Sequence, residues 1–363
     1  MTQQEWIINA KCIINASGPF TDCIRNMDDK VVNMTHPVPE VHISLPVYFN
    51  TKNVGLIKLQ NNKPAMYFLP WHGQTIVNTT DTKCQVTTCS TPNEEDIKKM
   101  CQQVKIFLAP QVKINRDEVC SSWMGVQTSI TDPNKDTQHF VKHHVVHVSP
   151  TKLITIAGGH PTIHRLMAEK AIDKAIDINN LKPTINRSIT KYLKLEGGHF
   201  WTPTMYIKIV QEFGIDADVA KHLTKTYGDR ASTVVRMATL NQKNGPTLGN
   251  RLHPNYPFID AEVRYGIQEY ACTASDMVAQ RLGLAFQDTK AAYETLPAII
   301  DIMAEELKWS KFEKRKQMKQ AEEYLKNEML LKCKTIPQEE TKDIPETSKH
   351  DDKDPHNNTK VCF

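Results

Sequence analysis

The residue pattern changes once along this chain, near residue 180, and this change constrains the fold more than any other feature. Before it, short β-branched and aromatic runs alternate with Pro and Asn, as is typical of antiparallel strands. After it, apolar residues recur at the spacing of an α-helix. We therefore expect a β-rich region followed by a helical unit. The expected strands include 41–46, 65–69 and 75–79, and the expected helices include 203–213, 217–227, 260–270, 273–282 and 289–307.

Two further helices are expected among the strands. One runs to about residue 108 and begins after Thr91 or Asn93, either of which can cap it, with acidic residues in the first turn. A residue pattern typical of strands returns at 141–157, and apolar residues at helical spacing follow at 162–176. After a charge-dense helical segment at 311–331, the tail 332–363 has almost nothing to bury, so we expect it to be disordered.

Length, charge and cysteine pattern exclude several protein classes. With 363 residues the chain exceeds the usual size of one core, so we expect more than one packed unit. Its net charge of +4 is too small for nucleic-acid binding through bulk electrostatics. The nine cysteines include no C-x-x-C pair, which favours reduced thiols. No apolar run has the length of a membrane-spanning helix, and the first residues show no targeting leader.

Two side-chain clusters have both a functional and a structural interpretation. Four histidines suggest a metal site together with two more nearby: His139, His143, His144 and His147, with His160 and His164. Strand alternation, however, puts His143 and His147 on one face and His144 on the other, so we expect no metal. The basic segment 308–319 would touch anionic lipid or a partner, or it would be the solvated face of a packed helix. We favour the second interpretation of that segment.

Glycine stands where two expected strands must turn sharply. One turn passes through Gly18 after Asn15, and the other passes through Gly158 and Gly159 just before a helix. Free N–H groups at a helix start carry partial positive charge and bind anions such as a pyrophosphate. Alternatively, each glycine merely permits a positive φ in a tight turn. Both interpretations stay open on these residues alone.

Six motifs occur in an order that resembles one known family. They are Asn15-Ala-Ser-Gly-Pro-Phe-Thr-Asp22, Phe68-Leu-Pro-Trp71, Thr79-Thr-Asp-Thr82, Ile154-Thr-Ile-Ala-Gly-Gly159, Met167-Ala-Glu169 and Tyr265-Gly-Ile-Gln-Glu-Tyr-Ala-Cys-Thr273. Together they resemble FAD-dependent glycerol-3-phosphate dehydrogenase. That mitochondrial flavoprotein is an oxidoreductase that converts glycerol 3-phosphate to dihydroxyacetone phosphate and passes electrons to ubiquinone. The resemblance runs from about residue 1 to about residue 331 and is to the C-terminal part of the family only.

The resemblance implies a mixed α+β and α/β fold. An incomplete FAD-binding α/β domain is interleaved with a β-rich substrate domain, and a helical C-terminal domain follows. The implied segments are a remnant of the FAD-binding domain (1–30), the substrate domain (31–128), a return segment of the FAD-binding domain (129–180), the helical domain (181–331) and the disordered tail (332–363).

The resemblance also implies site residues. The remnant of the FAD site consists of Asn15, Ala16, Gly18, Gly158 and Gly159. The substrate-binding positions are Gln127, His160, Thr162 and Asp81. The family has an arginine that grips the substrate phosphate where Gln127 stands, and a lysine where His160 stands. No catalytic residue is assigned.

The 363 residues contain no G-x-G-x-x-G turn, which holds the FAD pyrophosphate in this family. Two hypotheses follow. The first is a glycerol-3-phosphate dehydrogenase that uses FAD and ubiquinone at the mitochondrial inner membrane, with peripheral membrane contact. The second is a catalytically inactive truncated relative that acts as a binding module or is a non-functional product, for which a cytosolic location is open. We predict that this chain alone is inactive.

Overall fold

The structure is a computed structural model that separates into two units, residues 1–331 and 332–363. The second unit, which includes the tail expected to be disordered, lies outside the described residues. The structure describes residues 6–29, 32–49, 54–60, 63–79, 91–105, 108–109, 111–133, 140–141, 143–185, 187–238, 240–241 and 247–331.

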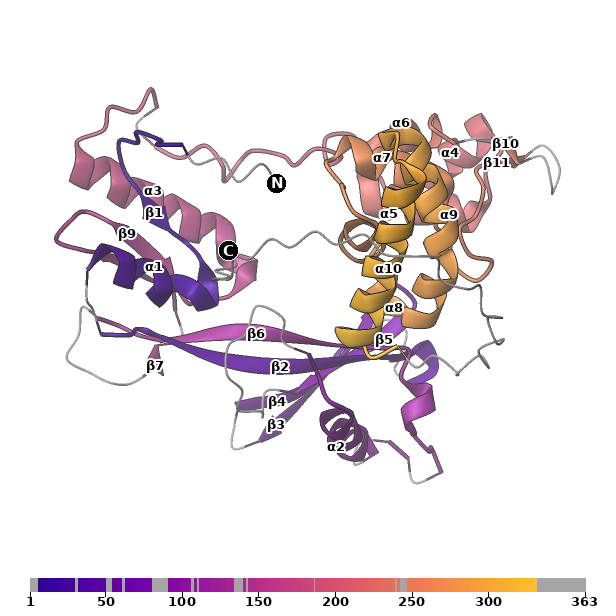
Figure 1. Ribbon diagram of the computed structural model, residues 1–363, viewed down its shortest axis with the longest axis horizontal. Helices are drawn as coiled ribbons and strands as arrows, with labels where there is room; N and C mark the ends of the chain where they lie inside the picture. Colours follow the sequence, from indigo (N-terminus) through magenta and orange to yellow (C-terminus); the bar gives the residue numbers. More distant parts are fainter. Residues whose placement is uncertain are drawn as a thin grey trace, which may run out of the picture. The chain divides into compact units, whose positions relative to one another are not determined.

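A six-stranded antiparallel sheet confirms the strands expected in the first half of the chain (Figure 1). The longest strand, residues 35–46, pairs with a neighbouring strand on each side. The strands expected at 41–46, 65–69 and 75–79 each lie within an observed strand. In sheet order the strands are β3 (Leu56–Gln60), β4 (Lys63–Trp71), β5 (Gln74–Thr79), β2 (Thr35–Pro46), β6 (Ser121–Thr131) and β7 (Phe140–Val141).

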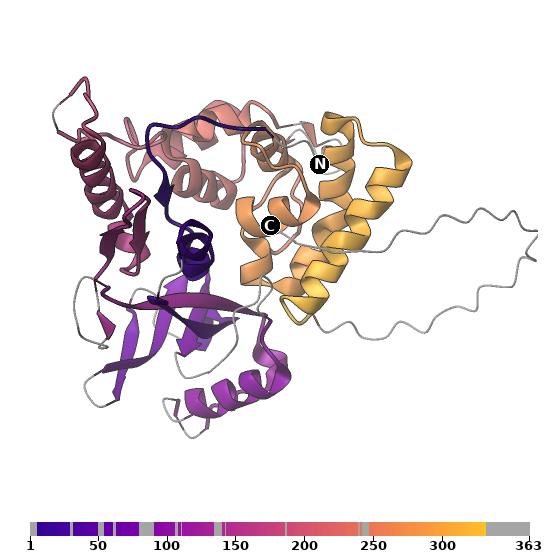
Figure 2. The same cartoon turned by 60° about the vertical axis from the view of Figure 1, so that its left-hand side comes forward.

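The two faces of this sheet differ because side chains alternate along each strand. In β2, Val41, Ile43 and Leu45 are at most 3% exposed and pack with the apolar stripe of α2 (Glu94–Lys105). Figure 2 shows α2 lying along this side of the sheet. Asn93 caps α2 as expected, because its side-chain Oδ1 accepts from the backbone N–H of Asp96 at 2.8 Å. The opposite face of the sheet is therefore left for polar side chains.

A second, three-stranded sheet has the order β1 (Ile14–Asn15), β9 (Ile154–Ala157) and β8 (Val145–Val148). Strands β1 and β9 are parallel, and β8 is antiparallel to β9. The strand expected at the start is only two residues long here. The glycine turns lead into η1 (Gly18–Phe20) with α1 (Thr21–Asp28), and into η4 (Pro161–Ile163) with α3 (His164–Asn179).

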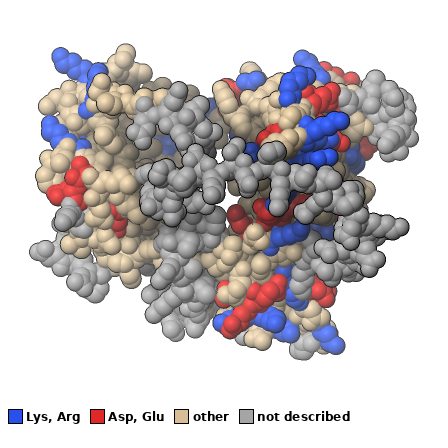
Figure 3. All heavy atoms as spheres, viewed as in Figure 1, with Lys and Arg blue, Asp and Glu red and all other residues tan. Residues whose placement is uncertain are grey.

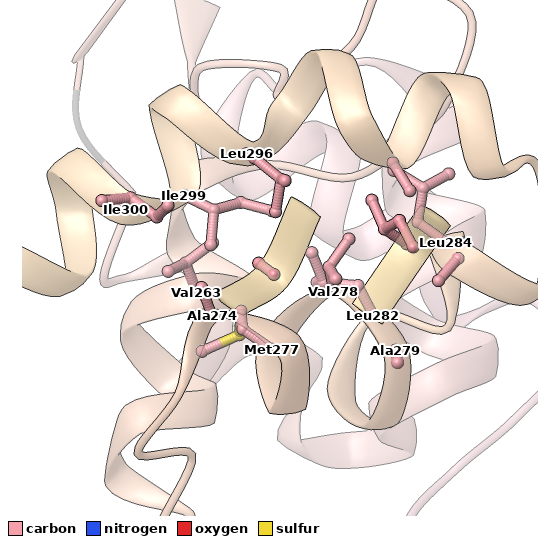
Figure 4. Packing of buried hydrophobic residues seen from close by; sticks show 14 of the residues in the cluster. Val263, Ala274, Met277, Val278, Ala279, Leu282, Leu284, Leu296, Ile299 and Ile300 are labelled. Carbon is pink, nitrogen blue, oxygen red and sulfur yellow. The ribbon is translucent and has the colours of Figure 1, made fainter. Parts of the chain in front are cut away.

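Helices dominate the described residues after 180, as expected. Buried side chains from the later helices form one core (Figure 4), and α4, α5 and α6 contribute to another. A short β10–β11 pair and a π-helix were not expected. The elements are α4 (Met205–Phe213), α5 (Ala217–Tyr227), η5 (Gly228–Arg230), α6 (Ala231–Val235), β10 (Leu240–Asn241), β11 (Thr247–Leu248), α7 (Asp260–Gln268), η6 (Asp276–Arg281), α8 (Leu284–Gln287), α9 (Thr289–Leu307) and α10 (Lys311–Asn327).

The helical part meets the large sheet along β6. The hydroxyl of Ser121 donates to the carbonyl of Ala285 in α8 at 2.7 Å, and the Trp123 ring meets the Phe286 ring edge-on at 5.1 Å. Basic and acidic side chains are interspersed over the helices on the face that Figure 3 shows. Within the described part of the chain, no helix has both the length and the apolar character needed to cross a membrane.

Candidate functional site

A polar face lies on the large sheet, opposite α2. Strand pairing sets Glu40 of β2 across from Gly125 of β6, and His42 across from Trp123. Directly opposed residues of an antiparallel pair share one face, and so do residues two positions apart in a strand. Gln127 therefore shares this face and is the diagonal neighbour of Glu40. We call Glu40, His42, Trp123 and Gln127 the polar face.

His42 packs against an aromatic residue of the neighbouring strand. Its ring stacks on Trp123 with centroids 5.3 Å apart and planes 6° from parallel. Burial lowers the pKa of His42, which favours a neutral imidazole at neutral pH. Its Nδ1 lies 3.3 Å from the Glu40 carbonyl oxygen, and because a carbonyl can only accept, Nδ1 carries the proton. The Nε2 atom keeps a lone pair that can take a proton from an alcohol.

Glu40 is the acid of the polar face. Burial raises the pKa of the Glu40 carboxyl, and the nearby His160 opposes that rise. His160 belongs to the turn after β9, so this interaction links the Gly158-Gly159 turn to the polar face. The strand register and this interaction thus bring Glu40, Gln127 and His160, which belong to three chain segments, into one neighbourhood.

His160 and Thr162 interact through hydrogen bonds at the start of η4. The His160 Nδ1 accepts from the Thr162 backbone N–H at 3.3 Å and lies 2.9 Å from its hydroxyl. A ring nitrogen that accepts a hydrogen bond carries no proton, so in this arrangement the N–H of the ring is at Nε2. Both side chains are exposed, as is Gln127. Asp81, the fourth expected substrate residue, lies outside the described residues.

The two glycine turns stand side by side. Parallel pairing of β1 with β9 sets Ile14 beside Ile154, and the carboxyl ends of parallel strands meet at one edge. The Asn15 side chain is used within its own turn. Its Nδ2 donates to the Thr21 carbonyl at 3.0 Å, and its Oδ1 accepts from the Ser17 hydroxyl at 2.6 Å. Ala16 is exposed beside it.

The surroundings of the glycines test whether these turns fit a dinucleotide. A Cβ at Gly158 would lie 2.5 Å from the Ile130 side chain, and one at Gly159 would lie 3.0 Å from the Cβ of His144. Protein packing and positive φ therefore explain both glycines. A Cβ at Gly18 would meet nothing within 4 Å. Of the three glycines in these turns only Gly18 faces open space, and the sequence has no G-x-G-x-x-G, so the residues present do not fit FAD by themselves.

Comparisons with known proteins identify the family of this chain. Residues 2–163 match the FAD dependent oxidoreductase family, and residues 188–314 match the C-terminal domain of alpha-glycerophosphate oxidase. Over 338 residues the chain is 44% identical to the mitochondrial glycerol-3-phosphate dehydrogenase of Mus musculus, covering 92% of this chain and 46% of that protein. The chain belongs to the FAD-dependent glycerol-3-phosphate dehydrogenase family.

Two further comparisons also find glycerol-3-phosphate dehydrogenases. A probable mitochondrial glycerol-3-phosphate dehydrogenase of Caenorhabditis elegans is 43% identical over 333 residues, which cover 91% of this chain and 46% of that one. The crystal structure of the Bacillus halodurans dehydrogenase complexed with FAD matches with a TM-score of 0.68 at 24% identity, covering 88% of this chain and 62% of that chain. This structural likeness supports the fold. The chain spans about half the length of the curated relatives it matches.

Sequence reasoning missed Glu40 and His42. The signal for them was present, because residues 41, 43 and 45 are apolar while 40, 42 and 44 are polar. Their partners depend on the register of β2 with β6, which residue pattern does not specify. Among the described residues, no group of three His, Cys, Asp or Glu side chains is placed to hold a metal ion.

Proposed function

We propose that this chain contributes the alcohol-binding sheet face and the helical domain of a glycerol-3-phosphate dehydrogenase, and that the 363-residue chain is inactive by itself. The observation that carries this proposal is the polar face, where a neutral His42 stacks on Trp123 beside the turn that follows β9. Relatives named glycerol-3-phosphate dehydrogenase share 42–44% of residues with the chain. The absence of a dinucleotide turn from its sequence supports the predicted inactivity.

Within this proposal, His42 accepts the proton that the alcohol loses. An FAD held outside these residues would supply the hydride acceptor for oxidation of an alcohol, and this chain would supply a base for the alcohol proton. His42 is the candidate base because its imidazole is buried, neutral and oriented by a backbone carbonyl. Trp123 covers one face of that ring, and Phe286 packs edge-on against Trp123.

Quinone reduction, a mitochondrial inner-membrane location and peripheral membrane contact are further parts of this proposal. The names of the relatives support mitochondria. In the basic segment 308–319, Phe312 is 77% exposed, which suits contact with lipid. However, Lys314 pairs with Asp301, and Lys316 with Glu313, so these cations are partly neutralised. Such contact would be weak and sensitive to salt.

A second candidate function is a binding module without catalysis. It is favoured by the lack of a fixed cation at these two positions, because Gln127 has no charge and the His160 Nδ1 accepts a hydrogen bond. An arginine at the first position would form a charged, bidentate contact with a phosphate, and glutamine cannot replace it.

Grafting tests the assignment of Gln127 and His160 to the phosphate end of the site. Placing Gln and His at the matching positions of the complete Mus musculus relative should lower kcat/KM for glycerol 3-phosphate by about a hundredfold, because two phosphate contacts lose their charge. The KM should rise and flavin absorbance should stay normal. The matched control is the same enzyme with Asn at the position of exposed Asp173 on α3. Unchanged kcat/KM in the doubly substituted enzyme would remove these two positions from the site.

A further inference from the structure

We propose that Trp123 stabilises the positive charge that His42 acquires when it accepts a proton, and that Phe286 of the helical part holds Trp123 in position. This inference rests on the proposed function, since it concerns the base assigned there. It is carried by two ring contacts, one between His42 and Trp123 and one between Trp123 and Phe286. Trp123 and Phe286 act through His42 and are therefore positioning residues.

The first step is the charge that proton transfer creates. The alcohol O–H bond breaks and an N–H bond forms at Nε2, while the Nδ1 proton of His42 stays with the Glu40 carbonyl. The hydride leaves the alcohol carbon separately, for the FAD of the proposed function. The His42 ring thereby becomes an imidazolium, and burial disfavours this charged form.

The second step is the set of groups around the ring. Directly across from His42 lie Asn78 on β5 and Trp123 on β6, and neither side chain titrates. The short helix α8, which packs against Trp123, consists of Leu, Ala, Phe and Gln. Glu40 lies two positions away on the same strand and gives its backbone carbonyl to His42. Among these groups, the indole of Trp123 is the one stacked on the ring.

The third step is the attraction between a cation and an indole. The His42 and Trp123 ring centroids are 5.3 Å apart, and the ring planes are 6° from parallel. A cation within about 6 Å of a tryptophan ring centroid is attracted by the negative face of the π-system. A neutral imidazole lacks this charge, so the attraction grows as the proton arrives. Trp123 therefore favours proton acceptance by a ring that burial keeps neutral beforehand.

The fourth step is the support that the helical part gives to Trp123. The Trp123 side chain packs against the core of the later helices, where the Phe286 ring meets it at 5.1 Å and 77°. Hydrogen bonds join β6 to the chain on both sides of Phe286. The Ser121 hydroxyl donates to the Ala285 carbonyl at 2.7 Å, and the Thr289 backbone N–H donates to the carbonyl of residue 120 at 3.0 Å. The helical part thus fixes the indole on which His42 stacks.

The test follows the ring protons of His42 by NMR in the full 363-residue chain, with His42→Gln to assign the signals. Protons close to the face of an indole resonate upfield, so the His42 signals should be shifted upfield in the unaltered chain. Trp123→Leu keeps an apolar cover without a π-system. The upfield shift should vanish, and the pKa of His42, titrated through the same signals, should fall by about 0.5 to 1 unit. Trp123→Phe should restore part of both effects.

Phe286→Ala tests the contribution of the helical part. It should reduce the upfield shift of the His42 signals and move the pKa of His42 toward the value in Trp123→Leu. The matched control is Tyr293→Ala, because Tyr293 packs against the same helical core from α9, and it should leave the His42 signals unchanged. Far-UV circular dichroism checks that each variant is folded, and Phe286→Leu takes the place of Phe286→Ala if the alanine variant is not.

Three results would overturn the inference. They are a folded, unaltered chain whose His42 signals show no upfield shift, a pKa of His42 in Trp123→Leu that equals or exceeds the original, and His42 signals that the Phe286 variant leaves unchanged. None of these measurements needs catalysis. The role of His42 as base is tested separately, because Gln at the matching position of the complete Mus musculus relative should lower kcat by about a hundredfold or more. An unchanged kcat would contradict the proposed function without altering the NMR result.

Discussion

At the scale of single residues, Asp22 organises the junction between α1 and β2. Its carboxylate accepts hydrogen bonds from the backbone N–H of Met34 at 3.0 Å and of Thr35 at 2.8 Å, and from the Thr35 hydroxyl at 2.6 Å. Arg25 donates to its other oxygen at 2.6 Å and also reaches the Val32 carbonyl. Burial is the largest single influence on the Asp22 carboxyl and acts to raise its pKa. The hydrogen bonds act in the opposite direction, and together they lower the pKa of Asp22 below its usual value.

Replacing Asp22 should therefore destabilise the chain. Asp22→Asn leaves Arg25 buried without its counter-charge, and we expect the free energy of unfolding in urea to fall by about 3 kcal/mol at neutral pH. Because the folded pKa lies below the unfolded value of about 3.9, the contribution of Asp22 is present above that pH and is lost as pH falls through the folded pKa. The difference between the two proteins should shrink in that acid range.

Exposed Asp173 on α3 provides the control for Asp22. Asp173→Asn should change the free energy of unfolding by less than about 0.5 kcal/mol. A cost of Asp22→Asn as small as this, or one that does not vary between neutral and acid pH, would show that the carboxylate does not hold the junction.

At the scale of elements, periodicity predicted most of the helices and strands because apolar faces must be buried. It overestimated β1, since the pairing with β9 covers only Ile14 and Asn15. It also missed the π-helix Asp276–Arg281, because a register change within a helix leaves no apolar signature. The glycine turns were located correctly, but the choice between an anion cradle and a packing role needed the contacts of Gly158 with Ile130.

The two turns make a matched pair for substitution. Both Gly18 and Gly158 have positive φ, +59° and +71°, but only the second is crowded. Gly18→Ala should cost about 1 kcal/mol from backbone strain. Gly158→Ala adds a clash with Ile130 and should cost about 3 kcal/mol in urea unfolding. Equal costs would contradict the packing explanation, and Gly158→Ala with Ile130→Ala should recover part of the loss.

At the scale of the whole chain, apolar burial is uneven. The core that joins the N-terminal segment to the large sheet has four buried members, Met34, Ile130, Val145 and Ala157, whereas the later helices share a core of many residues (Figure 4). Ile7, Ile8 and Ile13 are at least 63% exposed, and in the described residues no strand pairs with the outer edge of β1. Exposed apolar residues and an open strand edge reduce local stability.

Limited proteolysis should cleave the locally less stable segments first. Cleavage should appear first before residue 34 and between residues 140 and 165, and a fragment that contains α7, α9 and α10 should persist longest. Mass spectrometry of the fragments over time gives the order of cleavage. Early loss of the helical fragment, with the N-terminal portion still intact, would contradict the expectation that the N-terminal portion is the less stable of the two.

We propose that the residues of this chain present the polar face and the helical part of the molecule and do not hold FAD by themselves. Titration of the purified 363-residue chain with FAD, followed by visible absorbance after removal of free flavin, tests it most directly. We predict a colourless protein, since of the three glycines in the two turns only Gly18 faces open space, and the sequence has no dinucleotide turn. A stoichiometric yellow complex would contradict the claim.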